Sequence, residues 1–471
     1  MAELKRNNNQ ISLQFLGGAG TVTGSKILIT YNESRIMVDC GLFQGLKKLR
    51  IKNWDKLPID PGSLSSVILT HAHLDHCGYL PVLIRDGFVG DIHCTYPTRD
   101  LSEIILKDSG KIQEEESERA NRYGYTKHRP AKPIYTVKDA EKSLANFVPH
   151  NYREWVIINN DLKFRLLNSG HILGSALVEL LVSGQRFLLT GDLGRMNPLL
   201  MHPPETVNHA NALVIESTYG DRLHPTVDPK KELKEVIRTT YGRRGILMIP
   251  TFAVERAQEL LFLISQLKEE GDFPGMPVYL DSPMGIDATI VLQEHADWHR
   301  LDRAGCRSLN SAAKLISSAD ASRVIVADPE PKIILAGSGM ISGGRILHYL
   351  DRHLGEEKNT VLLAGFQAAG TRGRSLVEGA SEIKFFGSYH QVKAEIKQMN
   401  SLSSHADQQD IISWLRHFKA APDHIFINHG EPHQADALRV KLMDTLHWKV
   451  TTASMHQTYL IDCPDSKIQA R

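Results

Sequence analysis

The chain has 471 residues, 42% of them hydrophobic and 23% charged, and its formal net charge is +1. This length allows about three domains with sizeable cores. The near-zero charge excludes a surface that is basic throughout, so any nucleic-acid-binding surface has to be local. Five cysteines, the last at 463, form no CxxC pair and indicate free thiols in a reducing compartment. Because no apolar run approaches the roughly 18 residues of a membrane span, we expect a cytoplasmic protein without a membrane segment.

The first 200 residues predict short strands bounded by Gly, Asn or Asp. These strands are expected at 11–17, 26–30, 35–41, 66–71, 162–168, 176–182 and 186–192. Residues 99–145 lie between them and are charged and helix-like. We expect a solvated helical arm there, with RNA contact as the less favoured alternative.

The pattern changes near residue 218, where β-type apolar runs begin to alternate with helix-like stretches. A helix-like stretch at 255–270 lies among β-rich runs at 237–251, 276–281, 331–338 and 360–366. Such alternation predicts βα units on a mainly parallel sheet. A strand at 424–430 then leads back into a His-containing loop. We therefore expect a second α/β domain inserted into the first, which the C-terminal segment completes.

The run HAHLDH at 71–76 places three imidazoles and a carboxylate within six residues, directly after the apolar segment VILT. Imidazole nitrogen and carboxylate oxygen are the ligands that zinc and similar divalent metals take. On an extended backbone, His71 and His73 can face one ion while Asp75 and His76 turn toward a second. The alternative is a solvated His-rich loop.

Two later residues have matching chemistry. His171 lies in NSGHILGSA between two predicted strands, and Asp192 ends the strand-like run RFLLTGD. Taken alone, His171 is more typical of a structural histidine and Asp192 of a turn or cap residue. Together with HAHLDH, they complete a set of ligands for two metals.

The order HxHxDH, then His, then a strand-ending Asp resembles that of the metallo-β-lactamase superfamily of hydrolases. The resemblance implies an αββα sandwich with metals at one edge. Asp39, in VDCGLFQG, matches the superfamily's first motif, in which the Asp supports the metal-binding loop from behind. The simpler interpretation of Asp39 is a turn residue at the end of a strand.

Three further segments narrow the resemblance to the β-CASP group, the nucleic-acid-processing branch of the superfamily. ALVIESTYGDR contains Glu216, SSHADQ contains His405 and INHGEP contains His429, and these are similar to motifs A, B and C. A His in motif C is typical of RNA-acting members. The implied division is a first metallo-β-lactamase part at 1–217, an inserted β-CASP domain at 218–400 and a completing part at 401–471.

The resemblance also implies roles for these residues. One zinc ion is held by His71, His73 and His171, a second by Asp75, His76 and His429, and Asp192 bridges the two; manganese can take the same ligands. The catalytic residues are Asp75, Glu216 and His405, with His405 giving a proton to the leaving 3′ oxygen and Glu216 orienting it. Two metals offset the charge of the phosphodiester and lower the pKa of water. The expected products carry 5′-phosphate and 3′-hydroxyl ends.

Two glycine-rich segments are candidates for holding single-stranded RNA. AGSGMISGGR at 336–345 contains Ser338 and Gly339 ahead of a helix-like stretch, where loop amides can bind phosphate. FQAAGTRGR at 366–374 adds Arg372 and Arg374, which can clamp phosphates. Both segments resemble those lining the RNA channel of β-CASP nucleases. No Walker loop is present, so we expect no use of ATP.

We therefore predict a zinc-dependent ribonuclease that cuts RNA internally, with 5′-exonuclease action left open. The alternatives are a DNA nuclease of the same branch, a small-molecule metallo-hydrolase and a non-catalytic scaffold. His429 argues against a DNA nuclease. A small-molecule hydrolase is disfavoured because it has no use for the inserted domain or for the Glu216/His405 pair. A non-catalytic scaffold is disfavoured because no residue of the predicted metal-ligand set is missing from the sequence. The sequence leaves open which RNA sequences are preferred and whether the protein is a monomer or a homodimer.

Overall fold

The computed structural model describes residues 10–124 and 126–462. The outer ends of the predicted segments 1–217 and 401–471, and with them Cys463, lie outside this part. The other four cysteines are buried and form no disulfide. None of the described helices is long and apolar enough to cross a membrane.

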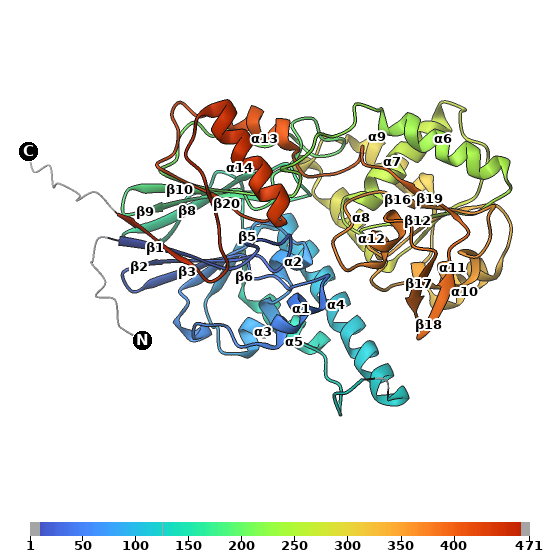
Figure 1. Cartoon of the computed structure of the whole chain (residues 1–471), viewed down its shortest axis with the longest axis horizontal. Coiled ribbons are helices and arrows are strands. Elements are labelled where there is room, and N and C mark those ends of the chain that lie inside the picture. The colour runs from blue at the N-terminus through green and yellow to red at the C-terminus, as the bar shows by residue number, and fades with distance from the viewer. Residues whose placement is uncertain (1–9, 125, 463–471) are drawn as a thin grey trace, which may run out of the picture.

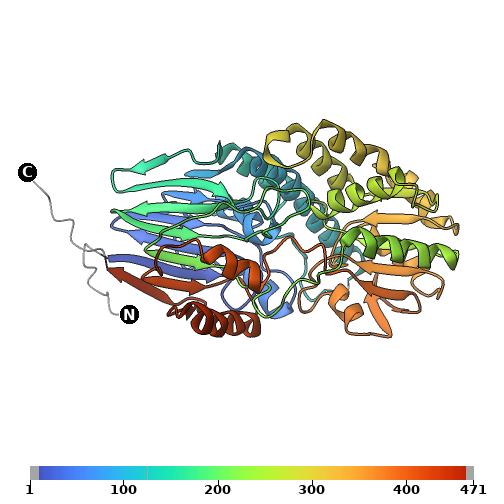
Figure 2. The same cartoon turned by 90° about the horizontal axis from the view of Figure 1, so that it is seen from above.

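Two seven-stranded sheets pack face to face in the half of the molecule that holds both ends of the described chain (Figures 1 and 2). The first has the order β22-β1-β2-β3-β4-β5-β6, with bounds Thr458–Asp462, Gln10–Gly17, Lys26–Tyr31, Ser34–Val38, Ser66–Ile68, Asp91–Thr95 and Phe147–His150. The second has the order β21-β20-β11-β10-β9-β8-β7, with bounds Thr451–Thr452, His424–Ile427, Ala212–Ile215, Gln185–Leu189, Ala176–Val182, Leu162–Asn168 and Val156–Asn159.

An apolar layer between the two sheets holds the sandwich together. Alternate residues of β1, Ile11, Leu13 and Phe15, are fully buried in this layer. The Phe15 ring packs 5.8 Å from that of Phe426 in β20 of the opposite sheet. The outer face of the first sheet is covered by α3, α4 and α5, and that of the second by α13 and α14, with bounds Leu80–Arg85, Tyr96–Tyr123, Val137–Ser143, Gln408–Leu415 and Pro432–Leu446. The layers are therefore α, β, β and α, as predicted.

The other half of the molecule is built on a six-stranded sheet whose strand pairs are all parallel. Its order is β14-β13-β15-β12-β16-β19, with bounds Lys314–Leu315, Val278–Asp281, Ile333–Ala336, Leu247–Pro250, Thr360–Leu363 and Glu395–Gln398. Helices cover both faces: α6 to α9 on one, and α10 to α12 on the other. Their bounds are Pro229–Gly242, Arg256–Glu269, Pro283–Glu294, Arg303–Ala312, Ala319–Ala327, Ile346–His353 and Arg372–Val377, and a hairpin of β17 (Glu382–Phe385) and β18 (Ser388–Gln391) adjoins α12.

The predicted inserted α/β domain is confirmed, because the parallel sheet lies in the chain between β11 and β20 of the sandwich. The borders at 217/218 and 400/401 stay predictions. One detail was wrong: the β-rich run expected at 237–251 begins as the end of α6, and only Leu247–Pro250 forms a strand.

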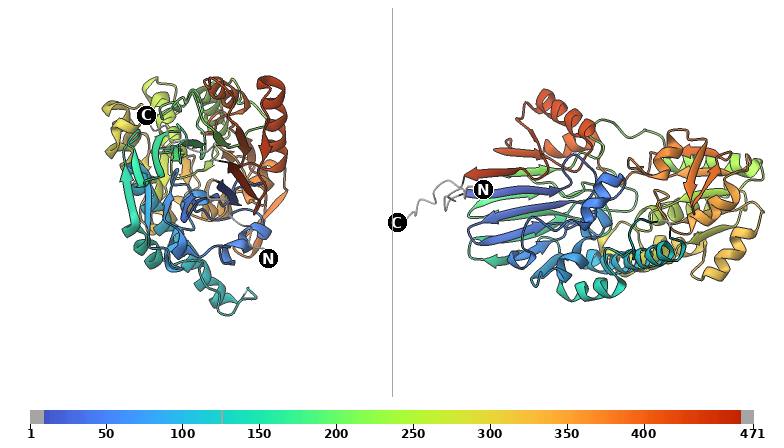
Figure 3. Two further views of the ribbon diagram at one scale, coloured as in Figure 1. Left: turned by 90° about the vertical axis from the view of Figure 1, so that its left-hand side faces the viewer. Right: turned by 60° about the horizontal axis from the view of Figure 1, so that its bottom comes forward.

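The segment 99–145 was also described too simply as a solvated arm. It forms α4 and then α5. In the first half of α4, the side chains of Leu101, Ile105 and Leu106 are buried. The α4 helix packs against α5 and against α8 of the inserted domain. Only its second half projects into solvent (Figure 3). The apolar residues recur at helical spacing among the charges, so the high charge of the segment concealed a buried stripe.

Candidate metal and catalytic centre

Parallel strands gather the predicted site residues at one edge of the sandwich. Strands β10, β11 and β20 pair in parallel in the second sheet and β3 and β4 in the first, and the loops after the carboxyl ends of both sets carry the residues that cluster there. The strands expected at 66–71 and 186–192 end earlier, at Ile68 and Leu189, which leaves the metal-binding residues in loops. These loops, with the short helix α2 (Leu74–Cys77), carry His71, His73, Asp75, His76, His171, Asp192, Glu216, His405 and His429.

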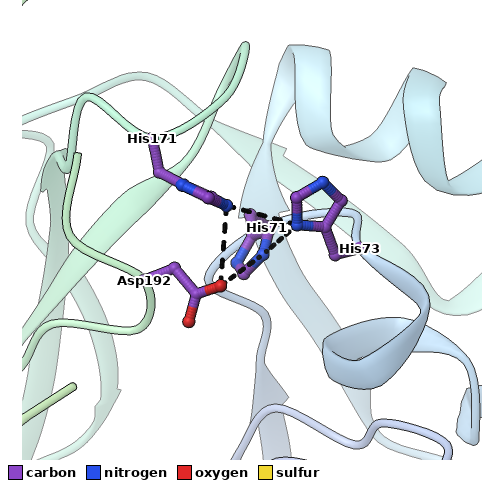
Figure 4. Close-up of side chains that lie close together, drawn as sticks. All are labelled: His71, His73, His171 and Asp192. Atoms are coloured by element: carbon purple, nitrogen blue, oxygen red, sulfur yellow. Dashed lines mark hydrogen bonds and ion pairs between the residues drawn. The ribbon is translucent and has the colours of Figure 1, made fainter. Parts of the chain in front are cut away.

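A first group of ligand atoms comes from three histidines and one carboxylate (Figure 4). His73 Nδ1 lies 3.1 Å from His71 Nε2 and 3.2 Å from His171 Nε2. Asp192 Oδ2 lies 3.5 Å from the Nε2 atoms of both His71 and His171. Ligand atoms of a tetrahedral zinc at about 2.0–2.1 Å lie roughly 3.3 Å apart, so these separations fit the edges of a zinc site.

A second group is formed by Asp75, His76 and His429. The Nε2 atoms of His76 and His429 are 3.1 Å apart, and His429 Nε2 lies 3.4 Å from Asp75 Oδ2. The other oxygen of Asp192, Oδ1, lies 3.3 Å from His76 Nε2 and 3.3 Å from His429 Nδ1, the ring nitrogen of His429 that does not face Asp75. The two oxygens of Asp192 therefore face different groups.

The donor set fits zinc. The Asp192 side chain is buried, and its Oδ1 atom has no hydrogen-bond partner among the described residues. A buried carboxylate oxygen left without a proton donor is costly, and a cation removes that cost. Nitrogen from imidazole with oxygen from carboxylate is the combination that zinc accepts.

Electrostatics keep the first group ready to bind a cation. Burial and the neighbouring His76 hold the pKa of His71 well below its usual range, and burial with His405 does the same for the pKa of His171. Burial lowers the pKa of His73 to about 4. These imidazoles are therefore neutral at pH 7, with a lone pair free for a metal.

Asp39 lies where the sequence suggested, behind the metal-binding loop. Its Oδ1 accepts hydrogen bonds from the Thr70 backbone N–H at 2.8 Å and from Thr70 Oγ1 at 2.9 Å. Its Oδ2 lies 2.7 Å from His76 Nδ1. Donation from His76 Nδ1–H to this oxygen turns the Nε2 lone pair toward the ligand group.

His405 and Glu216 form a pair beside the metal ligands. His405 Nδ1 lies 3.0 Å from Glu216 Oε1, and the other Glu216 contacts are the N–H groups of Leu193 at 2.7 Å and Thr218 at 3.1 Å. Burial alone lowers the pKa of His405, but the Glu216 carboxylate, its hydrogen bond and Asp192 raise it to about 9. His405 therefore carries a proton at neutral pH.

Three further residues support the site and were missed. Thr70 Oγ1 lies 3.0 Å from His71 Nδ1, and Ser175 Oγ accepts the His171 N–H at 3.1 Å. His224 Nε2–H donates to the His405 carbonyl oxygen at 2.8 Å. Thr70 and Ser175 stand beside motifs already noticed, so their positions offered a signal. Nothing in the sequence connects His224 with His405.

The two glycine-rich segments have internal contacts that the sequence did not reveal. Ser338 Oγ accepts the N–H groups of Ser342 and Gly343 at 2.9 and 3.2 Å, so these amides already have a partner. Arg372 donates to the carbonyl oxygens of Ile341, Ser342 and Lys384.

The two segments contact each other, since the Gly373 N–H donates to the Met340 carbonyl oxygen at 3.2 Å, but the remaining candidates for phosphate binding also have other contacts. Arg374 pairs with Glu378 one helical turn away, at 2.6 Å. Gly339 packs against Phe252, where an added Cβ would come within 2.5 Å of the ring. Ser338 and Arg372 thus hold loops in place, and direct contact of Ser338, Gly339, Arg372 and Arg374 with RNA stays a prediction.

An αββα sandwich with a His and Asp cluster at the carboxyl edge of its strands defines a metallo-hydrolase of the metallo-β-lactamase type. Residues 20–232 match the metallo-β-lactamase superfamily, 257–376 the Beta-Casp domain and 389–453 the Zn-dependent metallo-hydrolase RNA specificity domain. The chain belongs to the β-CASP ribonuclease group of this superfamily.

Similar proteins extend over nearly the entire chain. It is 32% identical to Ribonuclease TTHA0252 of Thermus thermophilus, covering 90% of this chain and 94% of that protein. It is 32% identical to transcription termination factor FttA of Methanocaldococcus jannaschii, covering 90% and 68%, and 30% identical to an RNase J-like protein of the same organism, covering 93% and 96%. A crystal structure of a protein of unknown function from Enterococcus faecalis shares the fold, with a TM-score of 0.54, 13% identity and coverage of 96% and 100%.

Proposed function

We propose that this protein hydrolyses RNA phosphodiesters with two zinc ions and leaves 5′-phosphate and 3′-hydroxyl ends. The observation that carries the proposal is the position of Asp192, with Oδ2 3.5 Å from the Nε2 atoms of His71 and His171 and Oδ1 3.3 Å from His76 Nε2. One carboxylate can thus serve two ligand groups. When bound, zinc supplies Lewis-acid polarisation of the phosphodiester and lowers the pKa of water.

The substrate approaches from the side of Asp75 and His405. Their side chains are 19% and 16% exposed, whereas those of Asp192 and Glu216 are at most 1% exposed. Asp75 can accept the proton of the attacking water on this open side. His405 stands on the same side, with Nδ1 bonded to Glu216 and with Nε2 hydrogen-bonded to none of the described residues.

Departure of the ribose 3′ oxygen requires a proton, which His405 supplies. Its raised pKa keeps the imidazole protonated, and Glu216 balances the positive charge and fixes the ring. The pair lies beside the metal ligands, with His405 Nδ1 3.9 Å from Asp192 Oδ2. A proton donor is needed for an alkoxide leaving group, which favours phosphodiester cleavage over hydrolysis of an activated small molecule.

RNA is favoured over DNA because the segment that holds His405 and His429 matches an RNA specificity domain. Relatives named as a ribonuclease and as RNase J-like support the same substrate. Cleavage within the chain is the expected main mode, with 5′-exonuclease action as an additional one.

The test combines metal analysis with cleavage of a 5′-labelled RNA beside DNA of matched sequence. We expect two zinc ions per chain and internal RNA fragments with 3′-hydroxyl ends. Release of mononucleotides alone indicates a 5′-exonuclease. Equal cleavage of the DNA contradicts RNA specificity, and one tightly bound metal at full activity contradicts the two-metal assignment.

A further inference from the structure

An exposed group of cations and aromatic rings lies where the far end of α4 meets the β17–β18 hairpin. Phe386, at the hairpin turn, is 43% exposed, and Tyr389 in β18 is 64% exposed. Arg119 of α4 lies over the Phe386 ring at 5.7 Å, and Lys384 lies over the Tyr389 ring at 5.2 Å. Both elements project on the lower side of the molecule in Figure 1. We call Arg119, Lys384, Phe386 and Tyr389 the α4–hairpin patch.

More positive charge surrounds this patch. Glu116, one turn before Arg119 on α4, interacts electrostatically with Arg50, Arg119 and Arg372. These three guanidinium groups come from both domains, Arg50 and Arg119 from the sandwich and Arg372 from the inserted domain. Carboxylates lie on the same half of α4 as well, at Glu114, Glu115 and Glu118.

The patch connects with the catalytic centre through one loop. The Tyr219 ring lies 6.0 Å from His405, and the Phe366 ring lies 5.9 Å from Tyr219. From Phe366 the loop runs to Gly370, which touches Leu46 of the sandwich closely enough that an added Cβ would come within 2.9 Å of its side chain. Two residues later, Arg372 donates to the Lys384 carbonyl oxygen at 2.6 Å, one residue pair from the turn of the hairpin.

We propose that the α4–hairpin patch binds single-stranded RNA on the 5′ side of the cleaved bond. This inference rests on the proposed function. Bases stack on exposed aromatic rings whatever their identity, and neighbouring cations neutralise the phosphates, which is the chemistry that the patch offers. We assign the 5′ side from His405: the 3′ oxygen that it protonates belongs to the upstream nucleotide, and the loop that leads to the patch starts at Phe366, next to the buried Tyr219 that packs beside His405.

The proposal predicts that the dependence of cleavage on RNA length differs between the two directions along the RNA. Lengthening the RNA upstream of the cleaved bond, from two to twelve nucleotides, is expected to raise kcat/KM about tenfold, the effect of stacking roughly one base. Lengthening the RNA downstream by the same amount should not raise kcat/KM through the patch. An upstream binding surface also favours cleavage within the chain.

The experiment compares this upstream gain between variants. In Arg119→Glu and Phe386→Ala the gain should fall toward onefold, and Arg119→Glu should also reduce the salt dependence of RNA affinity. Lys441→Glu on α14 and Tyr241→Ala on α6 are matched controls, because both residues are exposed and belong to other surfaces. In these controls the gain should stay at the wild-type value.

The outcomes separate this inference from the proposed function. If the wild-type protein cleaves no RNA of any length, the proposed function is wrong. If it cleaves RNA but gains nothing from upstream nucleotides, or if both patch variants keep the full gain, the patch does not bind RNA. If Phe386→Ala instead converts a dimer to a monomer in sedimentation with the gain retained, the patch is a contact between copies of this chain.

Discussion

Replacing Glu216 by Gln tests the proposed proton donor without changing the shape of the site. Glutamine has nearly the same size, and it removes the negative charge that faces His405 at 3.0 Å. Its amide oxygen can still accept one of the two N–H groups, of Leu193 and Thr218, that Glu216 now accepts. The substitution therefore acts mainly through charge, with a smaller cost from one mismatched N–H group.

The expected size of the effect follows from the pKa of His405. With a pKa of about 9, His405 is about 97% protonated at pH 7.5, whereas at its ordinary value of 6.5 it is about 9% protonated. Burial lowers the pKa, and the Glu216 carboxylate is the main group that opposes it. In Glu216→Gln the pKa should fall toward the ordinary value, so kcat at pH 7.5 should drop about tenfold from the protonation state alone.

The assay is the pH dependence of kcat for a short labelled RNA. The alkaline limb should move to lower pH in Glu216→Gln, and much of the lost activity should return near pH 5.5. Bound zinc repels an imidazolium in both proteins, so the shift between the two profiles is the quantity to measure. In a His405→Ala background the Gln substitution should cost almost nothing further. The assignment of His405 as proton donor would be refuted if the alkaline limb stayed in place in Glu216→Gln. It would also be refuted if the loss of kcat in the double variant equalled the product of the losses in the two single variants.

Four further substitutions give predictions. Asp192→Ala should release both metals and abolish activity, measured as zinc per chain; two retained ions with full activity would contradict the bridging role. His405→Ala should keep zinc and RNA binding but lose turnover by about 10²–10⁴-fold, and an RNA with sulfur as the leaving atom should recover much of this, with a thiophilic metal present if needed; loss of zinc would make His405 a ligand instead. Asp39→Asn should weaken zinc by about 10–100-fold in chelator competition, and unchanged affinity would remove its supporting role. Arg372→Ala should lower the melting temperature, because three carbonyl oxygens lose their hydrogen-bond donor. An unchanged melting temperature would contradict this structural role and favour RNA binding as the role of Arg372.

The ligand groups were predicted from the sequence through the resemblance of HAHLDH, His171 and Asp192 to the motifs of a known family. HAHLDH follows β4 and Asp192 follows β10, but these strands belong to different sheets, so strand pairing alone does not bring the two motifs together. The support from His224 and the contacts of Arg372 could not be predicted in this way. Their partners lie about 180 and 30 residues away, and only the packed structure brings them together. The burial of α4 was missed for a related reason, since its partner α8 belongs to the inserted domain.

The segment around His405 is held by contacts from both the sandwich and the inserted domain. Arg195, three residues after Asp192 in the sandwich, donates to the Ser401 carbonyl oxygen, and Arg256 at the start of α7 donates to Ser404 Oγ at 3.4 Å. The proposed metal ligands are fixed within the sandwich alone, whereas His405 is placed by contacts on either side of the domain border. With His405 as the proposed proton donor, we expect RNA that contacts both domains to act on the position of His405 more than on that of the metal ligands. A small ester or lactam is too short to contact both domains, so this arrangement favours an extended substrate.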